Sequence, residues 1–265
     1  MKRKIRLIES ELYTLLNGSV KSILNEILIK DKARKFMTFE EYLPIAIQRL
    51  SDGESPEEVF DRVYDFREGY AWVELNGKYN FINQNGELIN PNQWYNGVGS
   101  FHEGFAQVIL NGKGWNFINQ NGEYLTPNQW FDDIYGFDGG FAWVKLNGKG
   151  WNVINQNGEY LTPNQWFDDI SSFFGGFALV KLNGKGCNFM NQKGDILSPN
   201  QWFDNAYYFY GGFAWVKLNG ETYYINVKGE LCDENKSFIR NLRESVSERK
   251  MDMIIESTLR KYLRK

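Results

Sequence analysis

Two pairs of adjacent carboxylates are the side chains in this sequence whose type and spacing come closest to a reactive site. Asp132-Asp133 and Asp168-Asp169 could act as the acid and nucleophile of a glycoside hydrolase or as ligands of a metal ion. Neighbouring residues of one strand, however, point to opposite faces, so the two acids of a pair should not converge on one substrate. Their recurrence 36 residues apart favours a structural role such as capping.

Other reactive patterns are also weak. His102 is the single histidine, and no serine or cysteine motif accompanies it, so we expect an exposed loop residue and no nucleophilic triad. The segment 119–123, Asn-Gln-Asn-Gly-Glu, lacks the alternating acids of a calcium loop and is explained by a hairpin turn. No glycine-rich segment continues into the Lys-Ser or Lys-Thr of a phosphate loop. We therefore expect a protein that is not an enzyme, with no catalytic residues, no metal site and no cofactor.

A repeat of 36 residues organises the middle of the chain. Trp94, Trp130, Trp166 and Trp202 follow one another at this spacing, and the segment after each of them has nearly the same pattern. Within the third copy, two Asn-Gly pairs at 147–148 and 157–158 separate three short apolar segments. Because Asn-Gly suits the type I′ turn of a hairpin, each repeat is expected to be a three-stranded antiparallel meander.

The phase of the repeat follows from a hydroxyl residue and a proline. Thr126-Pro, Thr162-Pro and Ser198-Pro are each followed by Asn-Gln, a pattern that predicts a single capped helical turn. Ser55-Pro-Glu-Glu aligns with them, so residues 55–89 form a first repeat, and the first and last copies are one residue shorter after their Asn-Gly turn. The five repeats are expected at 55–89, 90–125, 126–161, 162–197 and 198–231, between a helical segment 1–54 and an amphipathic helix in 232–265.

One face of each predicted strand is constant and the other varies. Ala142, Val144 and Leu146 have the same residue types at the equivalent positions of all five copies, which indicates a core face. The opposite face carries tryptophan in three copies. These tryptophans either contact a partner or pack against the next repeat. They are Trp72, Trp143 and Trp215.

The pattern Phe-x-x-Gly-Phe-Ala-x-Val, Asn-Gly-Lys-Gly-Trp-Asn-x-Ile-Asn, Asn-Gly resembles the WG-containing repeat family, also called KWG repeats. The resemblance covers residues 55–231 and implies a β-repeat architecture with an interaction role and no catalytic residues. The order Gly150-Trp151 departs from the Trp-Gly of that family, and Cys187 replaces the tryptophan in the fourth copy. The Pro-Asn-Gln-Trp element is similar to versions found in Bacteroidales bacteria and their phages.

The beginning of the chain resembles a short leader found on otherwise unrelated proteins of such phages. The residues that carry this likeness lie within 5–12 and 19–26, and the likeness implies a docking or packaging tag. Apolar residues at helical spacing predict helices in 5–28, at about 38–50 and in 238–263. These helices either cover the open ends of the repeat array or bind a partner.

Composition narrows the function further. The net charge of −3 argues against nucleic-acid binding, and no apolar run is long enough to span a membrane. Two distant cysteines and the lack of a signal-peptide pattern favour a cytoplasmic protein, in the host cytoplasm or in a virion if the chain comes from a phage. We expect a mainly β tandem array that acts as a protein-interaction or scaffold module. An open solenoid-like array is favoured, and a five-bladed propeller is the alternative. The alternative function is that of a carbohydrate-binding aromatic repeat protein.

Overall fold

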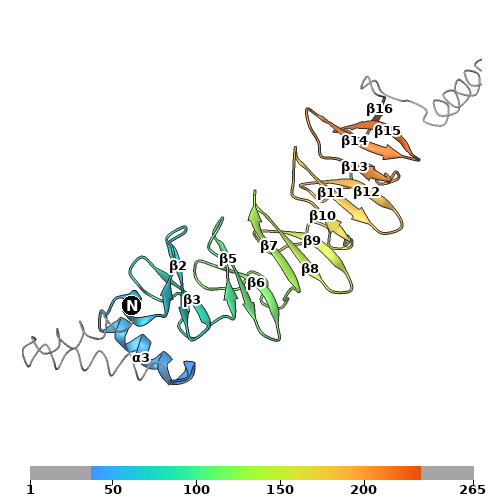
Figure 1. Ribbon diagram of the computed structural model, residues 1–265. Coiled ribbons are helices and arrows are strands. Elements are labelled where there is room, and N and C mark those ends of the chain that lie inside the picture. Colours follow the sequence, from blue (N-terminus) through green and yellow to red (C-terminus); the bar gives the residue numbers. More distant parts are fainter. Residues whose placement is uncertain (1–36, 234–265) are drawn as a thin grey trace, which may run out of the picture. The chain divides into compact units, whose positions relative to one another are not determined.

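The computed structural model describes residues 37–233, and this part of the chain is mainly β structure (Figure 1). It forms five antiparallel sheets in tandem, each built from consecutive strands, which confirms the predicted array of β repeats. The helices predicted in 5–28 and 238–263 lie outside the described residues. The chain divides into two compact units, one up to Lys113 together with Phe117–Tyr124, the other comprising Gly114–Asn116 and the residues from Leu125 onward.

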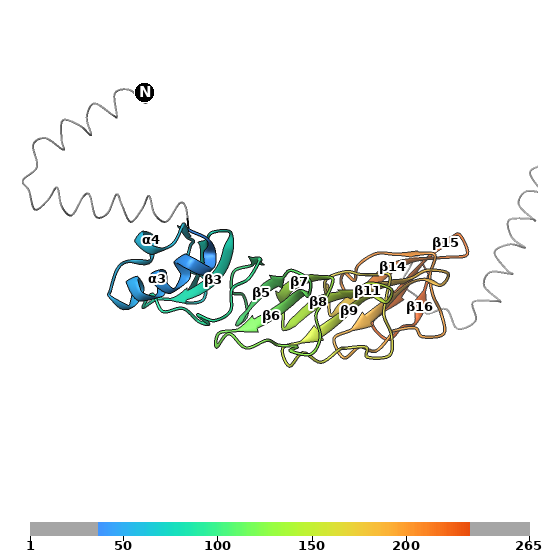
Figure 2. The same cartoon turned by 90° about the horizontal axis from the view of Figure 1, so that it is seen from below.

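The described part of the first unit, from residue 37, begins with two helices, seen from below in Figure 2. Helix α3 (Phe39–Ser51) matches the helix expected at about 38–50, and Thr38 and Glu41 form a capping box at its start. Helix α4 (Pro56–Val59) confirms the helical turn predicted after Ser55. The apolar side of α3 packs on the first sheet, where its buried residues join one core cluster with residues of that sheet.

The first two sheets have the same order, in which a short strand precedes a long hairpin, and they lie in the first unit except for Gly114–Asn116 of the last strand. The first sheet consists of β1 (Arg62–Val63), β2 (Tyr70–Leu75) and β3 (Lys78–Asn83), and the second of β4 (Gly97–Val98), β5 (Phe105–Leu110) and β6 (Gly114–Asn119).

The second unit contains three more sheets of this kind. They consist of β7 (Asp133–Asp138), β8 (Phe141–Leu146) and β9 (Gly150–Asn155); of β10 (Asp169–Ile170), β11 (Phe177–Leu182) and β12 (Gly186–Asn191); and of β13 (Asn205–Ala206), β14 (Phe213–Leu218), β15 (Glu221–Asn226) and β16 (Leu231–Cys232).

The repeats form antiparallel meanders as predicted, but one of the three predicted strands was assigned to the wrong segment. We expected the segment after the second Asn-Gly turn to be the third strand, but in the third sheet it contributes only the bridge between Ile154 and Tyr160. The third strand is instead β7, which precedes the hairpin and pairs with β8. The segment after the second turn is short because the chain turns again at Thr162. Only the fifth sheet extends this segment into a paired strand, β16.

Turn geometry follows the number of residues between the long strands. In the first sheet Asn76 and Gly77 both have positive φ, 48° and 71°, as a type I′ turn requires. In the third sheet only Gly148 of the Asn-Gly pair has positive φ, and Lys149 N–H donates to the carbonyl of Leu146 at 3.0 Å. The type I′ prediction therefore holds for the first sheet and is wrong for the third, where an additional residue, Gly150, lengthens the loop.

This additional glycine lies at the junction between consecutive sheets. Gly150 has φ of +106°, and a Cβ atom at this position would collide with the carbonyl oxygen of Phe167. The next residue, Trp151, exchanges two backbone hydrogen bonds with Phe167, at 2.7 and 2.9 Å. The absence of a side chain at Gly150 thus lets the chain entering the fourth sheet lie against the hairpin of the third.

A buried asparagine holds the turn that leads from one sheet to the next. Asn152 is completely buried, and its Nδ2 donates to the carbonyls of Thr162 at 2.8 Å and Gln165 at 3.1 Å. Its Oδ1 accepts from Val153 N–H and from the Thr162 hydroxyl. The same residue type is buried at the same place in four sheets, namely Asn80, Asn116, Asn152 and Asn188.

This contact explains why the helical turn predicted at Thr162 does not form. Asn152 donates to the carbonyls of both Thr162 and Gln165 and so ties both ends of this segment to the preceding strand. The Thr162 hydroxyl lies 2.8 Å from Gln165 O and 3.0 Å from Asn152 Oδ1, so its proton is directed at these acceptors. The predicted helical turn is therefore wrong here, and the segment is a single turn closed by Gln165 N–H on Thr162 O.

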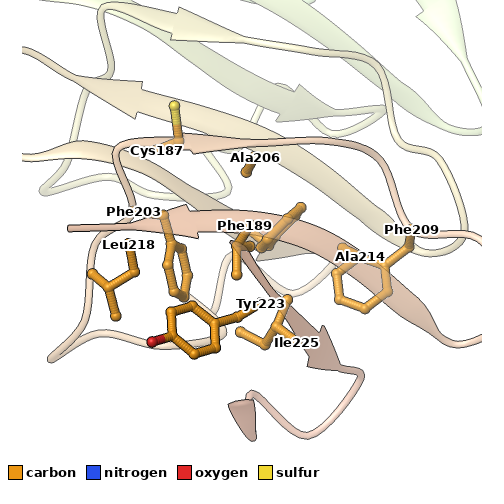
Figure 3. Close-up of a cluster of buried hydrophobic side chains, with 10 residues drawn as sticks. Cys187, Phe189, Phe203, Ala206, Phe209, Ala214, Leu218, Tyr223 and Ile225 are labelled. Atoms are coloured by element: carbon orange, nitrogen blue, oxygen red, sulfur yellow. The ribbon is translucent and has the colours of Figure 1, made fainter. Parts of the chain in front are cut away.

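Each sheet buries the face that the sequence marks as constant. Ala142 and Val144 are fully buried, as are their equivalents in the other sheets, whereas Leu146 is only half-buried. Aromatic residues fill the remaining space, as Figure 3 shows for the cluster around Phe189, Phe203 and Tyr223 in the fifth sheet and its neighbour.

We expect Asn152→Ala to lower the free energy of unfolding by about 2–4 kcal/mol, because it leaves several buried polar groups without a partner. Gln156→Ala, which removes an exposed amide of the same repeat, should change it by less than ~0.5 kcal/mol. Urea unfolding of the full chain, followed by tryptophan fluorescence, measures both. Equal midpoints for the two variants would contradict the role assigned to Asn152.

A second pair of variants separates steric collision from backbone strain. Gly150→Ala and Gly139→Ala both place alanine at positive φ, but only Gly150 has a neighbouring carbonyl in the space of the new Cβ. Gly139→Ala should cost about 1–2 kcal/mol, the strain of the left-handed conformation alone. Gly150→Ala should cost clearly more in the same unfolding experiment, and a smaller cost than that of Gly139→Ala would refute the proposed close approach.

Candidate functional site

The first carboxylate of each pair accepts hydrogen bonds from a hairpin turn. Asp132 accepts from the backbone N–H of Asn147 at 2.7 Å and from its side-chain amide at 2.6 Å. Asp168 makes the same two bonds to Asn183, at 2.6 and 2.7 Å. The first acid of each pair thus holds the Asn-Gly turn of its own sheet, which supports the structural interpretation drawn from the repetition.

The other residues considered for catalysis or metal binding, His102 and the segment 119–123, lie in or beside turns. His102 is exposed beside a turn, as expected. In the segment 119–123, Asn119 Oδ1 accepts from the N–H groups of Asn121 and Glu123, so these residues form the predicted hairpin turn. Within residues 37–233 no group of three or more histidine, cysteine or acidic side chains is placed to hold a metal ion. Over the same residues, no helix combines the length and the apolar character that a membrane crossing needs.

The two cysteines are free and buried. Burial raises the pKa of the Cys187 thiol, with a smaller opposing effect from Lys181, and burial likewise raises the pKa of the Cys232 thiol. Both thiols are therefore held in the protonated form, which is a poor nucleophile. Neither position has the electropositive, accessible surroundings of a reactive cysteine.

The three tryptophans proposed either to contact a partner or to pack against the next repeat lie on three different sheets. Trp143 is only 4% exposed, so it is wrong as a candidate exposed contact and the packing alternative holds for it. Its Nε1 donates to the carbonyl of Ser171 at 3.1 Å, and its ring lies 6.1 Å from that of Phe173, so it packs against the next sheet. Trp72 and Trp215 are half-buried. Trp72 stacks on Tyr64, and Trp215 meets Tyr207 edge to face at 5.0 Å.

More exposed aromatic side chains lie in the loops that join β10 to β11 and β13 to β14. Phe174, Tyr208 and Tyr210 are 59%, 53% and 86% exposed, and the rings of Phe174 and Tyr208 are 5.9 Å apart. We call these three residues the aromatic patch. With the ~200 Å² that an aromatic side chain can bury, they together expose about 400 Å² on the equivalent loops of two consecutive sheets.

The sequence contains a signal for this patch that the periodic pattern obscured. Phe174 and Tyr210 occupy one repeat position, directly after a phenylalanine that is present in every copy. The equivalents in the other copies are polar, namely Arg67, His102 and Asp138. An aromatic residue at a position where polar residues are tolerated is not required by the sheet.

A groove lies between the third and fourth sheets, both in the second unit. Its volume is about 450 Å³. The rings of Tyr135 and Trp151 stack 5.2 Å apart on its wall, and Lys145 Nζ lies 5.3 Å from the Trp151 ring. We call this the Tyr135 groove. It is lined by Tyr135, Gly136, Asp138, Trp143, Trp151, Asp169, Ile170 and Ser172.

Comparison with known proteins gives weak structural likenesses. The computationally designed protein Ika8 is 11% identical with a TM-score of 0.32, over 66% of this chain and 62% of that one. Kluyveromyces lactis Hsv2p is 10% identical with a TM-score of 0.33, over 64% and 62%. The extracellular domain of the putative one component system BT4673 from B. thetaiotaomicron is 16% identical with a TM-score of 0.30, over 71% and 32%. The chain thus spans less than two thirds of each of these proteins, and no curated protein matches it.

A comparison of the sequence with models of protein families gives one repeated match. The model of the WG containing repeat matches five successive stretches that together cover more than half of the chain. These stretches are residues 59–79, 81–113, 115–149, 151–185 and 189–221. From the second stretch onward, each match runs from the second long strand of one sheet to the Asn-Gly turn of the next sheet. The chain belongs to the WG containing repeat family.

Proposed function

We propose that this protein is a non-catalytic interaction module that binds a protein partner through the aromatic patch. The observation that carries the proposal is the exposure of Phe174, Tyr208 and Tyr210 on two consecutive sheets. Phenylalanine and tyrosine are enriched at the centres of protein interfaces, because each buries a large area and loses little side-chain entropy on binding.

The backbone beneath the aromatic patch is well fixed. Phe174 exchanges two backbone hydrogen bonds with Phe177, at 2.8 and 3.2 Å, and Tyr210 does the same with Phe213. The fourth and fifth sheets also touch at this end, where the α-carbon of Gly175 packs against Phe209. A surface held in this way pays less ordering entropy when it binds, which favours affinity.

The surroundings of the acidic and thiol side chains support the non-catalytic part of the proposal. Asp132 and Asp168 are engaged by their hairpin turns, and the thiols of Cys187 and Cys232 are buried and protonated. A scaffold role needs only a stable surface, and a tandem array of sheets provides one.

The proposed biological setting rests on the leader resemblance of the sequence. A phage or virion association is what the leader resemblance implies, with the host cytoplasm or the virion as the location. The residues that carry this resemblance lie within 5–26, outside the described part of the chain.

The test is capture from a lysate of the native source with the full chain as bait. The triple variant Phe174→Ser, Tyr208→Ser, Tyr210→Ser should reduce the captured partner at least tenfold, since interface aromatics often contribute more than ~1 kcal/mol each. The matched control is Phe66→Ser, which removes an aromatic side chain that is 45% exposed and lies outside the patch. Equal capture by the triple variant and the wild type would refute the proposal.

A further inference from the structure

We propose that the Tyr135 groove is a carbohydrate-binding subsite that takes a neutral pyranose unit of a glycan. This inference is independent of the aromatic patch, because the groove lies on other residues and has a different chemical character. Its volume of about 450 Å³ is within the range of small-ligand sites, ~300–1,000 Å³.

The aromatic wall suits the apolar face of a sugar ring. Tyr135 is 60% exposed, and its ring is held nearly parallel to that of Trp151, with 21° between the planes. Trp143 beside them is fixed by its hydrogen bond to Ser171. The C–H groups on one face of a pyranose carry partial positive charge, and they are attracted to the negative face of an aromatic ring.

The polar groups of the groove suit hydroxyl groups. A sugar hydroxyl both donates and accepts, so it needs partners of both kinds. Asp138 and Asp169 can accept, and the Ser172 hydroxyl can donate or accept. In the described part of the chain neither carboxylate has a cationic partner within 4.0 Å, so both are available to a ligand.

The charged side chains that line the groove argue against an anionic ligand. Asp138 and Asp169 are both lining residues and would repel an anion. Lys145 is not one of the lining residues, although its Nζ lies 5.3 Å from the centre of the Trp151 ring. A neutral polyhydroxylated ring can donate its hydroxyl hydrogens to both carboxylates. The charge of the lining therefore selects a neutral glycan over an acidic one.

The rings of the groove are not required for one sheet to pack on the next. At the equivalent positions of the fourth sheet, Ser171, Leu179 and Cys187 replace Tyr135, Trp143 and Trp151. The fourth sheet nevertheless packs on the fifth through one shared apolar core. Trp143 and Trp151 contribute to the core between the third and fourth sheets, but the exposed ring of Tyr135, which is a serine in the fourth sheet, exceeds what stacking demands.

The experiment is binding of the full chain to a panel of immobilised hexasaccharides, α- and β-linked, of glucose, galactose, mannose and N-acetylglucosamine. We expect at least one of them to bind, and titration of that free hexasaccharide should quench tryptophan fluorescence. Tyr135→Ala and Asp169→Asn should each weaken the binding at least tenfold. Both side chains are exposed, so the urea midpoints should remain those of the wild type.

The aromatic patch provides the matched control. The triple variant Phe174→Ser, Tyr208→Ser, Tyr210→Ser should bind the same hexasaccharide as tightly as the wild type. Absence of binding across the panel would overturn the inference, as would binding that survives both groove variants or is lost only in the patch variant. Loss of a captured protein in Tyr135→Ala, without any glycan binding, would overturn it in favour of a peptide site.

Discussion

The rest of the structure depends on the amide of a buried asparagine that takes its hydrogen-bond partners from a distant turn. Asn152 lies ten residues before Thr162. Its Oδ1 nevertheless accepts a hydrogen bond from the Thr162 hydroxyl, and its Nδ2 donates to two carbonyls of the turn. A buried amide without partners is costly, so the turn can hardly move without unfolding the strand that carries the asparagine. In the fifth sheet Tyr223 occupies this position and donates to Glu221 instead, so the contact belongs to the sheets that continue into another turn.

From this contact the junction between sheets follows. The turn places Phe167 beside Trp151, where the two residues exchange backbone hydrogen bonds, and the lack of a side chain at Gly150 permits the close approach. The side chains that point away from the junction are free to differ between copies without loss of the fold, and the two candidate surfaces lie on such side chains.

Local patterns predicted the architecture well, and long-range contacts decided the details. The 36-residue period and the Asn-Gly pairs are sufficient to predict tandem antiparallel hairpins, because these signals act within a few residues. The helical turn at Thr162 was wrong because its local capping pattern competes with Asn152, which no short window includes. The type I′ turn was wrong in the third sheet because one additional glycine changes the loop length. The first error could not be avoided without knowing which segments meet in space, whereas the additional glycine behind the second is visible in the sequence.

The repeat pattern identified some residues of the candidate surfaces correctly and led us to overlook others. Trp143 was chosen because large aromatic residues on a variable face are conspicuous, but a ring of that size on the side facing the next sheet is more stable when buried. Phe174 and Tyr210 were overlooked because they follow a constant phenylalanine and resemble part of the core pattern. The informative comparison is therefore between copies at a single position. Where Arg67 and His102 are tolerated, a ring serves no purpose within the sheet, and its exposure to solvent is a cost that binding would remove.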